Sequence, residues 1–352
     1  MKNADLSNKY IRYEVDEKPP LKLSILLAGQ IVLLIVAGIV LTPAIVLRGA
    51  NMPPGMEGGV IFFALLISGL FTFVQAKKIW RFGAGYVLLM GTSGAFIAVG
   101  ISALNEGGMP LLMTLIVASS LIQFVFASKL GLMRHLVTPL VGGTTIMLLA
   151  VTVMPVGFKL VNKEAVSGNL YENPVIAIAT LATIILVSFF GSRNLRLWAP
   201  VIGIAAGTVV SLLFSDFDST RIENAAWLGI PDIDWQGFDL SFGAGFWSLL
   251  PAFIVVTIVG ALETYGDAVA VQRISHRKRK AINFKSVQGA LYADGMGNLI
   301  SGVTGTMPNT TYSTSISVVD MTGVGAKSVG IWCGIIMMLL AFAPKLYAAI
   351  LS

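Results

Sequence analysis

Three acidic residues interrupt long apolar stretches in the C-terminal half of the chain. Glu263 and Asp267 lie in the sequence Leu-Glu-Thr-Tyr-Gly-Asp, and Asp294 lies in Tyr-Ala-Asp-Gly. Glu263 and Asp267 are four residues apart, so they share one face of a helix. Ionisable side chains inside apolar spans are costly and usually functional. These carboxylates are therefore candidates for accepting hydrogen bonds from a ligand's ring N–H groups and for proton coupling. A structural role in tying helices together is the alternative for Asp267 and Asp294.

Two segments rich in Gly and small polar residues also break the apolar pattern. One covers residues 82–94 and ends at Ser93 and Gly94, and the other covers residues 302–317. The second contains a Ser/Thr run, 310–317, in which Tyr312, Thr314 and Ser315 lie. Irregular backbone at membrane depth survives only where protein or a water-filled cavity satisfies it. A pair of interrupted spans in the two halves of a transporter is typical of its binding site, although close helix packing also favours small residues.

The composition requires that these residues be positioned by membrane-spanning elements. The chain has 352 residues, of which 55% are hydrophobic and 12% are charged, whereas a soluble domain is about 25% charged. This excludes a soluble globular enzyme and a disordered chain, and the single cysteine, Cys333, excludes a disulfide scaffold. The sequence has no metal-ligand spacing, phosphate loop or nucleophile elbow. We therefore expect neither an enzyme nor a resident cofactor.

Eleven apolar segments are long enough to span a bilayer, which takes about 20 residues. They cover residues 23–47, 59–76, 84–104, 108–127, 135–157, 173–191, 196–215, 246–270, 287–305, 308–325 and 328–350. The chain is thus predicted to be an all-α polytopic membrane protein. The third and tenth segments are the interrupted ones and lie seven apart, the offset that an inverted seven-span repeat produces.

Charges in the connections predict the orientation. Basic residues follow the second, fourth, sixth and eighth segments, namely Lys77, Lys78, Arg81, Lys129, Arg134, Arg193, Arg196 and the cluster from Arg273 to Lys285. Acidic residues follow the third, fifth and seventh, namely Glu106, then Glu164 and Glu172 beside two lysines, then a cluster from Asp216 to Asp239. Positive charge collects in cytoplasmic loops. The alternation of basic and acidic connections therefore predicts an N-terminus inside the cell. The net charge of +6 is explained by these cytoplasmic loops and does not indicate a nucleic-acid partner.

Four stretches resemble the nucleobase–ascorbate transporter family, also called nucleobase:cation symporter type 2. The first runs from Arg-Phe-Gly-Ala-Gly at 81–85 to Gly-Thr-Ser-Gly-Ala-Phe at 91–96, and the second is Thr-Pro-Leu-Val-Gly-Gly-Thr at 138–144. The third is Glu-Thr-Tyr-Gly-Asp at 263–267. The last is Ala-Asp-Gly-Met-Gly at 293–297 with Pro-Asn-Thr-Thr-Tyr-Ser at 308–313. They occur in the family's order across nearly the whole chain.

The resemblance implies a fourteen-span fold in two inverted halves, of which about eleven spans are present here. A cytosolic tail, 1–22, would precede a core domain made of 23–130 and 246–352. Residues 131–215 would belong to a gate domain, and 216–245 would form an extracytoplasmic loop. Short strands in the third and tenth spans would frame the site. The core would move against the gate as an elevator, usually in a homodimer.

The resemblance also implies the site residues. Substrate would lie between the tenth-span half-helix, with Thr314, Ser315 and neighbouring Tyr312, the third-span backbone at Ser93 and Gly94, and Glu263. Glu263 matches a carboxylate that hydrogen-bonds a nucleobase, and Asp267 and Asp294 match acidic positions important for transport. We therefore expect Glu263, Asp267 and Asp294 to take part in proton coupling, with Na⁺ as the alternative ion.

Three departures from the family pattern are expected to matter. A long amide or carboxylate expected in the tenth span is replaced by Thr314, and the following residues are Ser315, Ile316 and Ser317. The first span has Gln30-Ile31 where the family has Gln-His. The chain also ends at Ser352, after the eleventh segment, so that spans 12–14 would be missing; a truncated reading frame is the expectation, and a natural short form is the alternative.

These observations predict a cation-coupled symporter for a nucleobase such as uracil or xanthine in the cytoplasmic membrane. One alternative is a carrier of another small planar or anionic solute, such as ascorbate or the anions of sulfate permeases. Anion carriers of the same architecture tend to lack an acidic residue at the position of Glu263, so the resemblance argues against an anion. The other alternative is a membrane protein that binds its ligand without transporting it.

Overall fold

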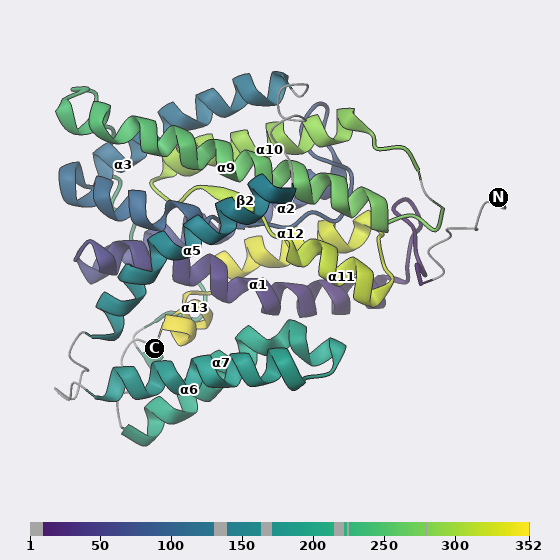
Figure 1. Cartoon of the computed structure of the whole chain (residues 1–352), viewed down its shortest axis with the longest axis horizontal. Coiled ribbons are helices and arrows are strands. Elements are labelled where there is room, and N and C mark those ends of the chain that lie inside the picture. The colour runs from purple at the N-terminus through teal and green to yellow at the C-terminus, as the bar shows by residue number, and fades with distance from the viewer. Residues whose placement is uncertain are drawn as a thin grey trace.

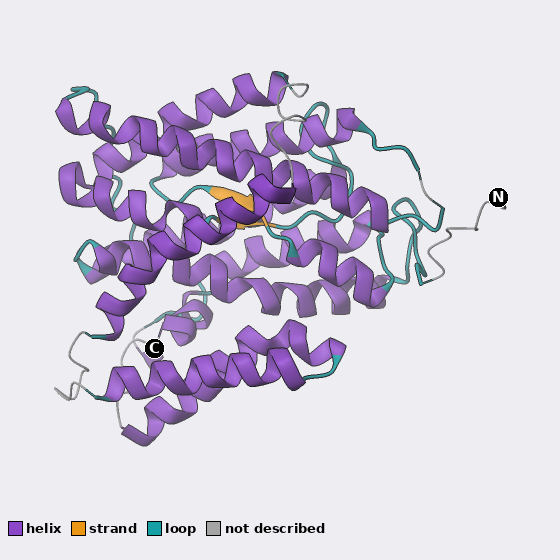
Figure 2. Cartoon of the chain, viewed as in Figure 1, coloured by secondary structure: helices purple, strands orange, loops and turns teal. Residues whose placement is uncertain are grey.

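The computed structural model describes residues 10–129, 139–162, 171–214, 222–223, 225–278 and 280–351. The described chain is a bundle of helices with one short pair of strands near its centre (Figure 2). Thr138 of the second motif, residues 1–9 of the tail and the 215–221 part of the acidic loop lie outside the described residues. Within the described part, five helices are long and apolar enough to cross a membrane, and a sixth span results if one bent pair is counted together. The chain is therefore a polytopic membrane protein, while the count of eleven spans remains a prediction.

The long helices coincide with the apolar segments of the sequence. In the N-terminal half these are α1 (Leu21–Gly49), α2 (Glu57–Lys77), α3 (Ile97–Ser128), α5 (Pro139–Val161), α6 (Glu172–Phe190) and α7 (Arg193–Phe214). In the C-terminal half they are α9 (Ala244–Ile274), α10 (Phe284–Thr304), α11 (Thr314–Thr322), α12 (Lys327–Ala341) and α13 (Pro344–Leu351). The third and fourth expected segments meet within α3, which is interrupted at Gly107 and Gly108, where φ is −149° and +65°.

The two interrupted segments pair with each other. β1 (Met90–Thr92) and β2 (Asn309–Thr311) are antiparallel, with Met90 opposite Thr311 and Thr92 opposite Asn309. A short 3₁₀ turn, η2 (Gly94–Phe96), leads from β1 into α3, and β2 leads into α11. The strands implied by the family resemblance are thus present. The fold is mostly helical with a small central ribbon, as expected, while the inverted repeat remains a prediction.

The last expected segment, 328–350, is not one continuous span. It consists of α12 and α13, which meet at an angle of 85°. Pro344 starts the second helix, and a proline cannot continue the hydrogen-bond ladder of the helix before it. The hydropathy of the sequence therefore located the apolar segment correctly but did not reveal its bend.

Small residues let helices from the two halves of the chain pack closely. A Cβ atom placed at Gly334 of α12 would lie 2.6 Å from the carbonyl oxygen of Gly69 in α2. A Cβ atom at Gly302 of α10 would lie 2.8 Å from a side-chain carbon of Val117 in α3. Close backbone approach at glycine is the usual way that helices associate in membranes. These contacts hold α2, α3, α10 and α12 in one core around the ribbon.

Helices α6 and α7 stand apart from that core (Figure 1). They pack on each other through Gly203, where a Cβ atom would lie 2.2 Å from the side chain of Ile184. Their outer faces carry exposed apolar side chains, including Phe189, Phe190 and Leu213. Exposed apolar surface of this kind suits contact with lipid or with further helices.

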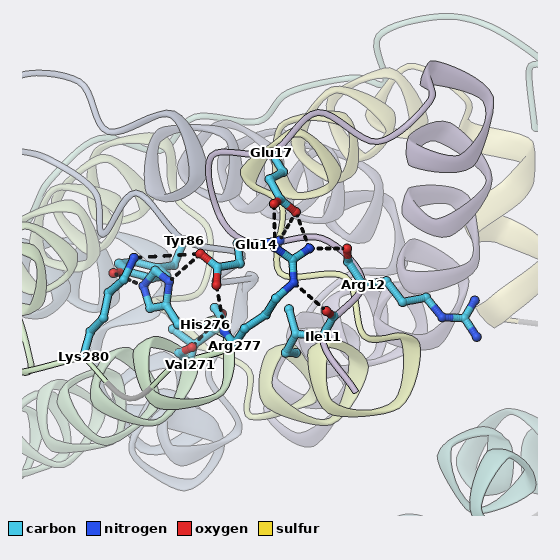
Figure 3. A network of polar contacts seen from close by, with 10 residues as sticks. Ile11, Arg12, Glu14, Glu17, Tyr86, Val271, His276, Arg277 and Lys280 are labelled. Atoms are coloured by element: carbon cyan, nitrogen blue, oxygen red, sulfur yellow. Dashed lines mark hydrogen bonds and ion pairs between the residues drawn. The ribbon is translucent and has the colours of Figure 1, made fainter. Parts of the chain in front are cut away.

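The two ends of the core carry opposite charge. At one end, the N-terminal segment crosses the basic connections, and Arg277 donates to both carboxylate oxygens of Glu17 at 2.6 and 2.7 Å (Figure 3). Backbone bonds also join Arg12 to Gly323 and Lys327 to Val15. At the other end, the acidic connection is tied down by bonds from the Trp235 indole to the Val303 carbonyl and from the Asp239 backbone to Pro110. Basic and acidic connections therefore lie at opposite ends, as the sequence predicts.

Candidate functional site

The ribbon places the beginnings of two helices at its two ends, in the middle of the molecule. The Ser93 backbone N–H donates to the Pro308 carbonyl at 2.7 Å, and the Tyr312 N–H donates to the Leu89 carbonyl at 2.9 Å. η2 and α3 therefore start beside the beginning of β2, and α11 starts beside the beginning of β1. The first turn of a helix has N–H groups without intrahelical partners and carries partial positive charge. Both helix starts are available to polar groups of a ligand.

Helix α9 presents two carboxylates to the second strand and its continuation. A carboxylate oxygen of Glu263 accepts a bond from the Thr310 hydroxyl at 3.3 Å. Asp267 accepts bonds from the hydroxyls of Thr311 and Ser313, each at 2.8 Å. Thr311 ends β2 and Ser313 directly precedes α11, so Asp267 joins the end of the strand to the start of the helix. Two carboxylates one turn apart on α9 therefore accept bonds from hydroxyls within residues 310–313.

Asp294, in the middle of α10, lies in a more enclosed network. One of its carboxylate oxygens accepts a bond from the Gln123 amide of α3 at 2.7 Å and another from the Thr264 hydroxyl of α9 at 2.9 Å. The Asn298 amide donates to Gln123 at 2.9 Å and accepts from the Asn309 backbone N–H at 2.6 Å. Asp294 is completely buried, and its second carboxylate oxygen has no partner among the described residues. A buried polar oxygen without a partner is unusual and calls for a functional explanation.

The two groups of carboxylates are continuous through a pair of threonines. The hydroxyl oxygens of Thr311 and Thr264 lie 3.4 Å apart, and both side chains are completely buried. Thr311 bonds Asp267, and Thr264 bonds Asp294. A chain of polar side chains therefore runs from the strand, across α9, to α10 and α3. Buried hydrogen bonds of this kind fix the relative position of the elements that they join, and the second oxygen of Asp294 is the atom of the network without a partner among the described residues.

Polar groups that are not used by the scaffold gather at the helix starts. Gly94 is exposed, and a Cβ atom there would meet only the Ile97 side chain, at 3.9 Å. The Ser93 hydroxyl is buried and has no partner among the described residues. Thr314 and Glu263 are half-buried. Among the described residues, these four positions therefore have polar groups that the scaffold does not fully use.

Two further residues of the expected site are engaged by the scaffold. The Ser315 hydroxyl donates to the Tyr312 carbonyl at 2.7 Å and accepts from the Leu89 N–H at 2.8 Å. The Tyr312 hydroxyl donates to the Thr92 carbonyl at 2.9 Å, and the ring covers Gly91. Tyr312 therefore points away from the face that carries Thr311 and Ser313. Both side chains hold the ribbon and the start of α11 in place.

The three carboxylates were predictable from the sequence, but the side chains that bond Asp294 and extend its network were not. Gln123, Thr264 and Asn298 lie in apolar stretches of the chain and are all buried. An amide in an apolar span is itself a signal, because it needs partners in the absence of water. The hydroxyls of Thr311 and Ser313 were recognised only as part of a polar run. Which of these residues meet is set by the pairing of segments that lie far apart in the sequence.

Comparison with known proteins is consistent with this architecture. A family model described as the permease family, covering xanthine and uracil permeases, matches residues 22–352. A Clostridium perfringens protein provisionally named as a purine permease is 28% identical over 99% of this chain and 76% of its own length. The xanthine permease XanP of Escherichia coli is 26% identical over 97% of this chain and 76% of its own length. These relatives are permeases and not enzymes.

A solved structure shows the same overall fold. The transmembrane domain of the cyanobacterial bicarbonate transporter BicA superposes with a TM-score of 0.59, covering 96% of this chain and 88% of the other, at 15% sequence identity. At that identity the likeness establishes the fold alone. From the central ribbon, the carboxylates of α9 and α10 and the match along residues 22–352, it follows that this chain belongs to the xanthine/uracil permease family, the nucleobase–ascorbate transporters.

Proposed function

We propose that this protein is a secondary active transporter that carries a nucleobase, such as xanthine or uracil, across the cytoplasmic membrane. The observation that carries the proposal is the position of Glu263, a half-buried carboxylate of α9 that contacts Thr310 in the ribbon between the two helix starts. Its one described hydrogen bond is the 3.3 Å contact with Thr310. A carboxylate has about four acceptor positions. Glu263 therefore retains capacity to accept bonds from the ring N–H groups of a nucleobase.

The other contacts follow from the same geometry. The carbonyl oxygens of xanthine and uracil are acceptors, and the backbone N–H groups at Gly94 and Thr314 begin the two helices that flank the site. The Ser93 hydroxyl, buried and unused among the described residues, is a further donor. Thr314 offers one small hydroxyl where a longer amide would make paired bonds. We therefore infer a pocket with room beyond a single pyrimidine ring, which favours a purine.

We propose that protons are the coupling ions, with Na⁺ as the alternative, and that no resident cofactor takes part. Asp267 and Asp294 accept bonds from hydroxyl and amide donors of other elements. A proton added to either carboxyl group turns one acceptor oxygen into a donor, which a partner hydroxyl can accept by rotating but which the Gln123 NH₂ group cannot. Protonation of Glu263, Asp267 and Asp294 is thereby linked to the relative position of α9, α10 and the strand. A linkage of this kind is what coupling of a proton to substrate binding requires.

The elevator scheme supplies the movement. In this proposal residues 23–130 and 246–352 form the core domain, and 131–215 contribute to a gate domain completed by further helices. The separation of α6 and α7 from the core supports that division (Figure 1). The basic end of the core faces the cytoplasm under the positive-inside rule. The inverted seven-span repeat, the fourteen-span total and a homodimer of the full-length form belong to the same proposal.

Ligand binding by the purified protein tests the substrate assignment. Xanthine and uracil are expected to raise the thermal unfolding midpoint, because a ligand that binds only the folded state stabilises it. Glu263→Gln is expected to weaken this binding about 10- to 100-fold, the equivalent of losing a hydrogen bond to a charged group. Glu106→Gln, which removes an exposed carboxylate beside the break in α3, is the matched control. Equal binding by Glu263→Gln and wild type would exclude Glu263 from the site.

Two other functions are alternatives to this proposal. One is a carrier of small anions, such as the bicarbonate named for the protein of similar fold. Bicarbonate, sulfate and ascorbate therefore belong in the same panel of ligands, and stabilisation by one of them in place of the nucleobases would select that alternative. A protein that binds nucleobases with the expected dependence on Glu263, yet accumulates none in cells, would be a binder and not a transporter.

A further inference from the structure

A cavity lies at the basic end of the core, partly lined by the stretch that leads into β1. Its volume is about 320 Å³, within the range of small-molecule sites. The polar residues that line it include Lys77, Lys78, Lys327, His276, Tyr86 and Ser286. They come from the end of α2, the stretch before β1, the connection after α9 and the starts of α10 and α12. In Figure 3, Tyr86 and His276 stand side by side, and their hydroxyl oxygen and ring nitrogen are 3.3 Å apart.

The charge of this lysine cavity is unbalanced. Among the residues that line it, three are lysines and one, Asp16, is a carboxylate. The Lys78 ammonium lies 3.4 Å from the neutral Ser286 hydroxyl, and the Lys77 ammonium lies 5.2 Å from the centre of the Phe73 ring. Neither of these contacts neutralises a positive charge. The cavity therefore has a surplus of positive charge at the surface of the molecule.

Asp16, the one carboxylate among the lining residues, competes only weakly with an anionic ligand for Lys327. Asp16 pairs with Lys327 at 2.7 Å, but the Asp16 side chain is 83% exposed and that of Lys327 is 43% exposed. Exposed ion pairs contribute little to stability, because water screens them and both side chains lose freedom. An anion in the cavity can therefore take the place of Asp16 at Lys327 with little loss of stability.

The backbone conformation of Lys78 is unusual and is consistent with a binding role for its side chain. Lys78 ends α2 with φ of +54°, a left-handed conformation that favours glycine. Strained conformations of this kind are retained where the surroundings demand them, often at binding sites. The cavity also borders the first turns of α10 and α12, whose positive dipole ends add to the potential of the lysines.

We propose that the lysine cavity binds a phosphate group, as a site separate from the one that binds the nucleobase. Lysine is a common binder of phosphate as a point charge, and three lysines with two hydroxyls supply enough donors for its oxygens. The phosphate belongs either to the headgroup of an anionic lipid at the membrane surface or to a small soluble phosphorylated molecule. In both cases it joins α2, α12 and the N-terminal segment at one point. Bound phosphate would thereby hold these elements together at the basic end of the core.

Two arms of one experiment separate the sources. In the soluble arm, inorganic phosphate and guanosine monophosphate are titrated into the full chain purified in neutral detergent. In the lipid arm, the protein is placed in phosphatidylcholine nanodiscs with and without phosphatidylglycerol, and native mass spectrometry counts retained lipids. Lys78→Gln combined with Lys327→Gln is compared with wild type. Lys22→Gln, at the exposed start of α1 and outside the lining, is the control.

The proposal predicts binding in at least one arm that weakens about fivefold for each lysine removed and is unchanged in Lys22→Gln. Lys78→Arg with Lys327→Arg keeps both charges and is expected to bind as wild type does. If the double glutamine variant does not fold, Lys77→Gln alone is expected to show the fivefold loss. Absence of binding in both arms overturns the proposal. Binding that is equal in wild type and in the glutamine variants overturns it as well.

Discussion

At the scale of single residues, the three membrane carboxylates differ in how completely they are enclosed. Glu263 is half-buried with one long described hydrogen bond, whereas Asp267 has two hydroxyl donors at 2.8 Å. Asp294 is completely buried and is bonded by Gln123 and Thr264. This order, from reachable to enclosed, matches a division between substrate contact at Glu263 and proton coupling deeper in the core.

The Gln123 amide is the residue-scale test of the enclosed network. Gln123→Leu removes the donor to Asp294 and the acceptor of the Asn298 amide. Leaving buried polar groups without partners costs about 1–3 kcal/mol, so the thermal unfolding midpoint of the purified protein is expected to fall. The pH dependence of uptake is expected to shift in the same variant. Gln236→Ala, in the exposed acidic connection, is the control and is expected to change neither quantity.

The residue types of the site were predictable from the sequence, and their partners were not. Glu263, Asp267 and Asp294 stand out because a carboxylate in an apolar membrane segment is energetically costly and is usually functional. The roles of Tyr312 and Ser315 required the structure, because a tyrosine or serine in a polar run has no sign of which face it takes. The pairing register places Thr311 opposite Met90, and that register alone turns Tyr312 toward Gly91.

At the scale of elements, the ribbon depends on glycine at one position and tolerates a side chain at another. A Cβ atom at Gly91 would lie 2.4 Å from the Tyr312 ring, whereas one at Gly94 would have open space. Gly91→Ala is expected to destabilise the protein by about 1–3 kcal/mol through overpacking. Gly94→Ala is expected to leave the thermal unfolding midpoint unchanged but to weaken xanthine binding. Identical behaviour of the two variants in both measurements would contradict the assigned positions.

The N-terminal segment is a second element whose attachment can be tested. Hydrogen bonds from Arg277 hold the pKa of Glu17, and that of Glu14, below their ordinary values. A carboxyl group with a lowered pKa in the folded state stabilises that state above its ordinary pKa, near 4.5, and the contribution is lost as the pH falls further. Acidification below about pH 4.5 is therefore expected to release the segment.

Limited proteolysis measures that release, with an acid-active protease for the acidic samples, a protease active at neutral pH for the neutral ones, and rates at each pH divided by those for an unstructured peptide. Cleavage within residues 10–18 is expected to accelerate on acidification in the wild type. Glu17→Gln is expected to show faster cleavage already at neutral pH, because the bidentate pair with Arg277 is gone. Asp239→Asn changes a carboxylate in the acidic connection, at the other end of the core, and serves as the control. A cleavage rate in Glu17→Gln equal to that of the wild type would show that the pair does not hold the segment.

The helices of the fold were largely predictable, because hydropathy reports burial in lipid directly. The segments expected at 23–47 and 59–76 appear as α1 and α2 with bounds shifted by a few residues. The bend between α12 and α13 and the pairing of β1 with β2 were not visible in composition. Both depend on contacts between segments far apart in the chain, on which hydropathy carries no information.

At the scale of the whole molecule, the fold combines a compact core with a loosely attached pair of helices. The core contains the ribbon, the carboxylates and the lysine cavity, while α6 and α7 pack mainly on each other (Figure 1). In the elevator scheme proposed here, the core carries the substrate and the part that contains α6 and α7 stays in place. Membership of the permease family sets the expectation that this arrangement serves transport.

Uptake of labelled xanthine and uracil, in cells that lack their own nucleobase carriers, tests the central claim most directly. The wild-type chain and Glu263→Gln are expressed at equal levels and assayed with and without a protonophore. Accumulation by the wild type that collapses with the protonophore, together with loss of uptake in Glu263→Gln, is the predicted result. Uptake that persists in Glu263→Gln, or accumulation that the protonophore leaves unchanged, would contradict a proton-coupled nucleobase carrier with Glu263 at its substrate site.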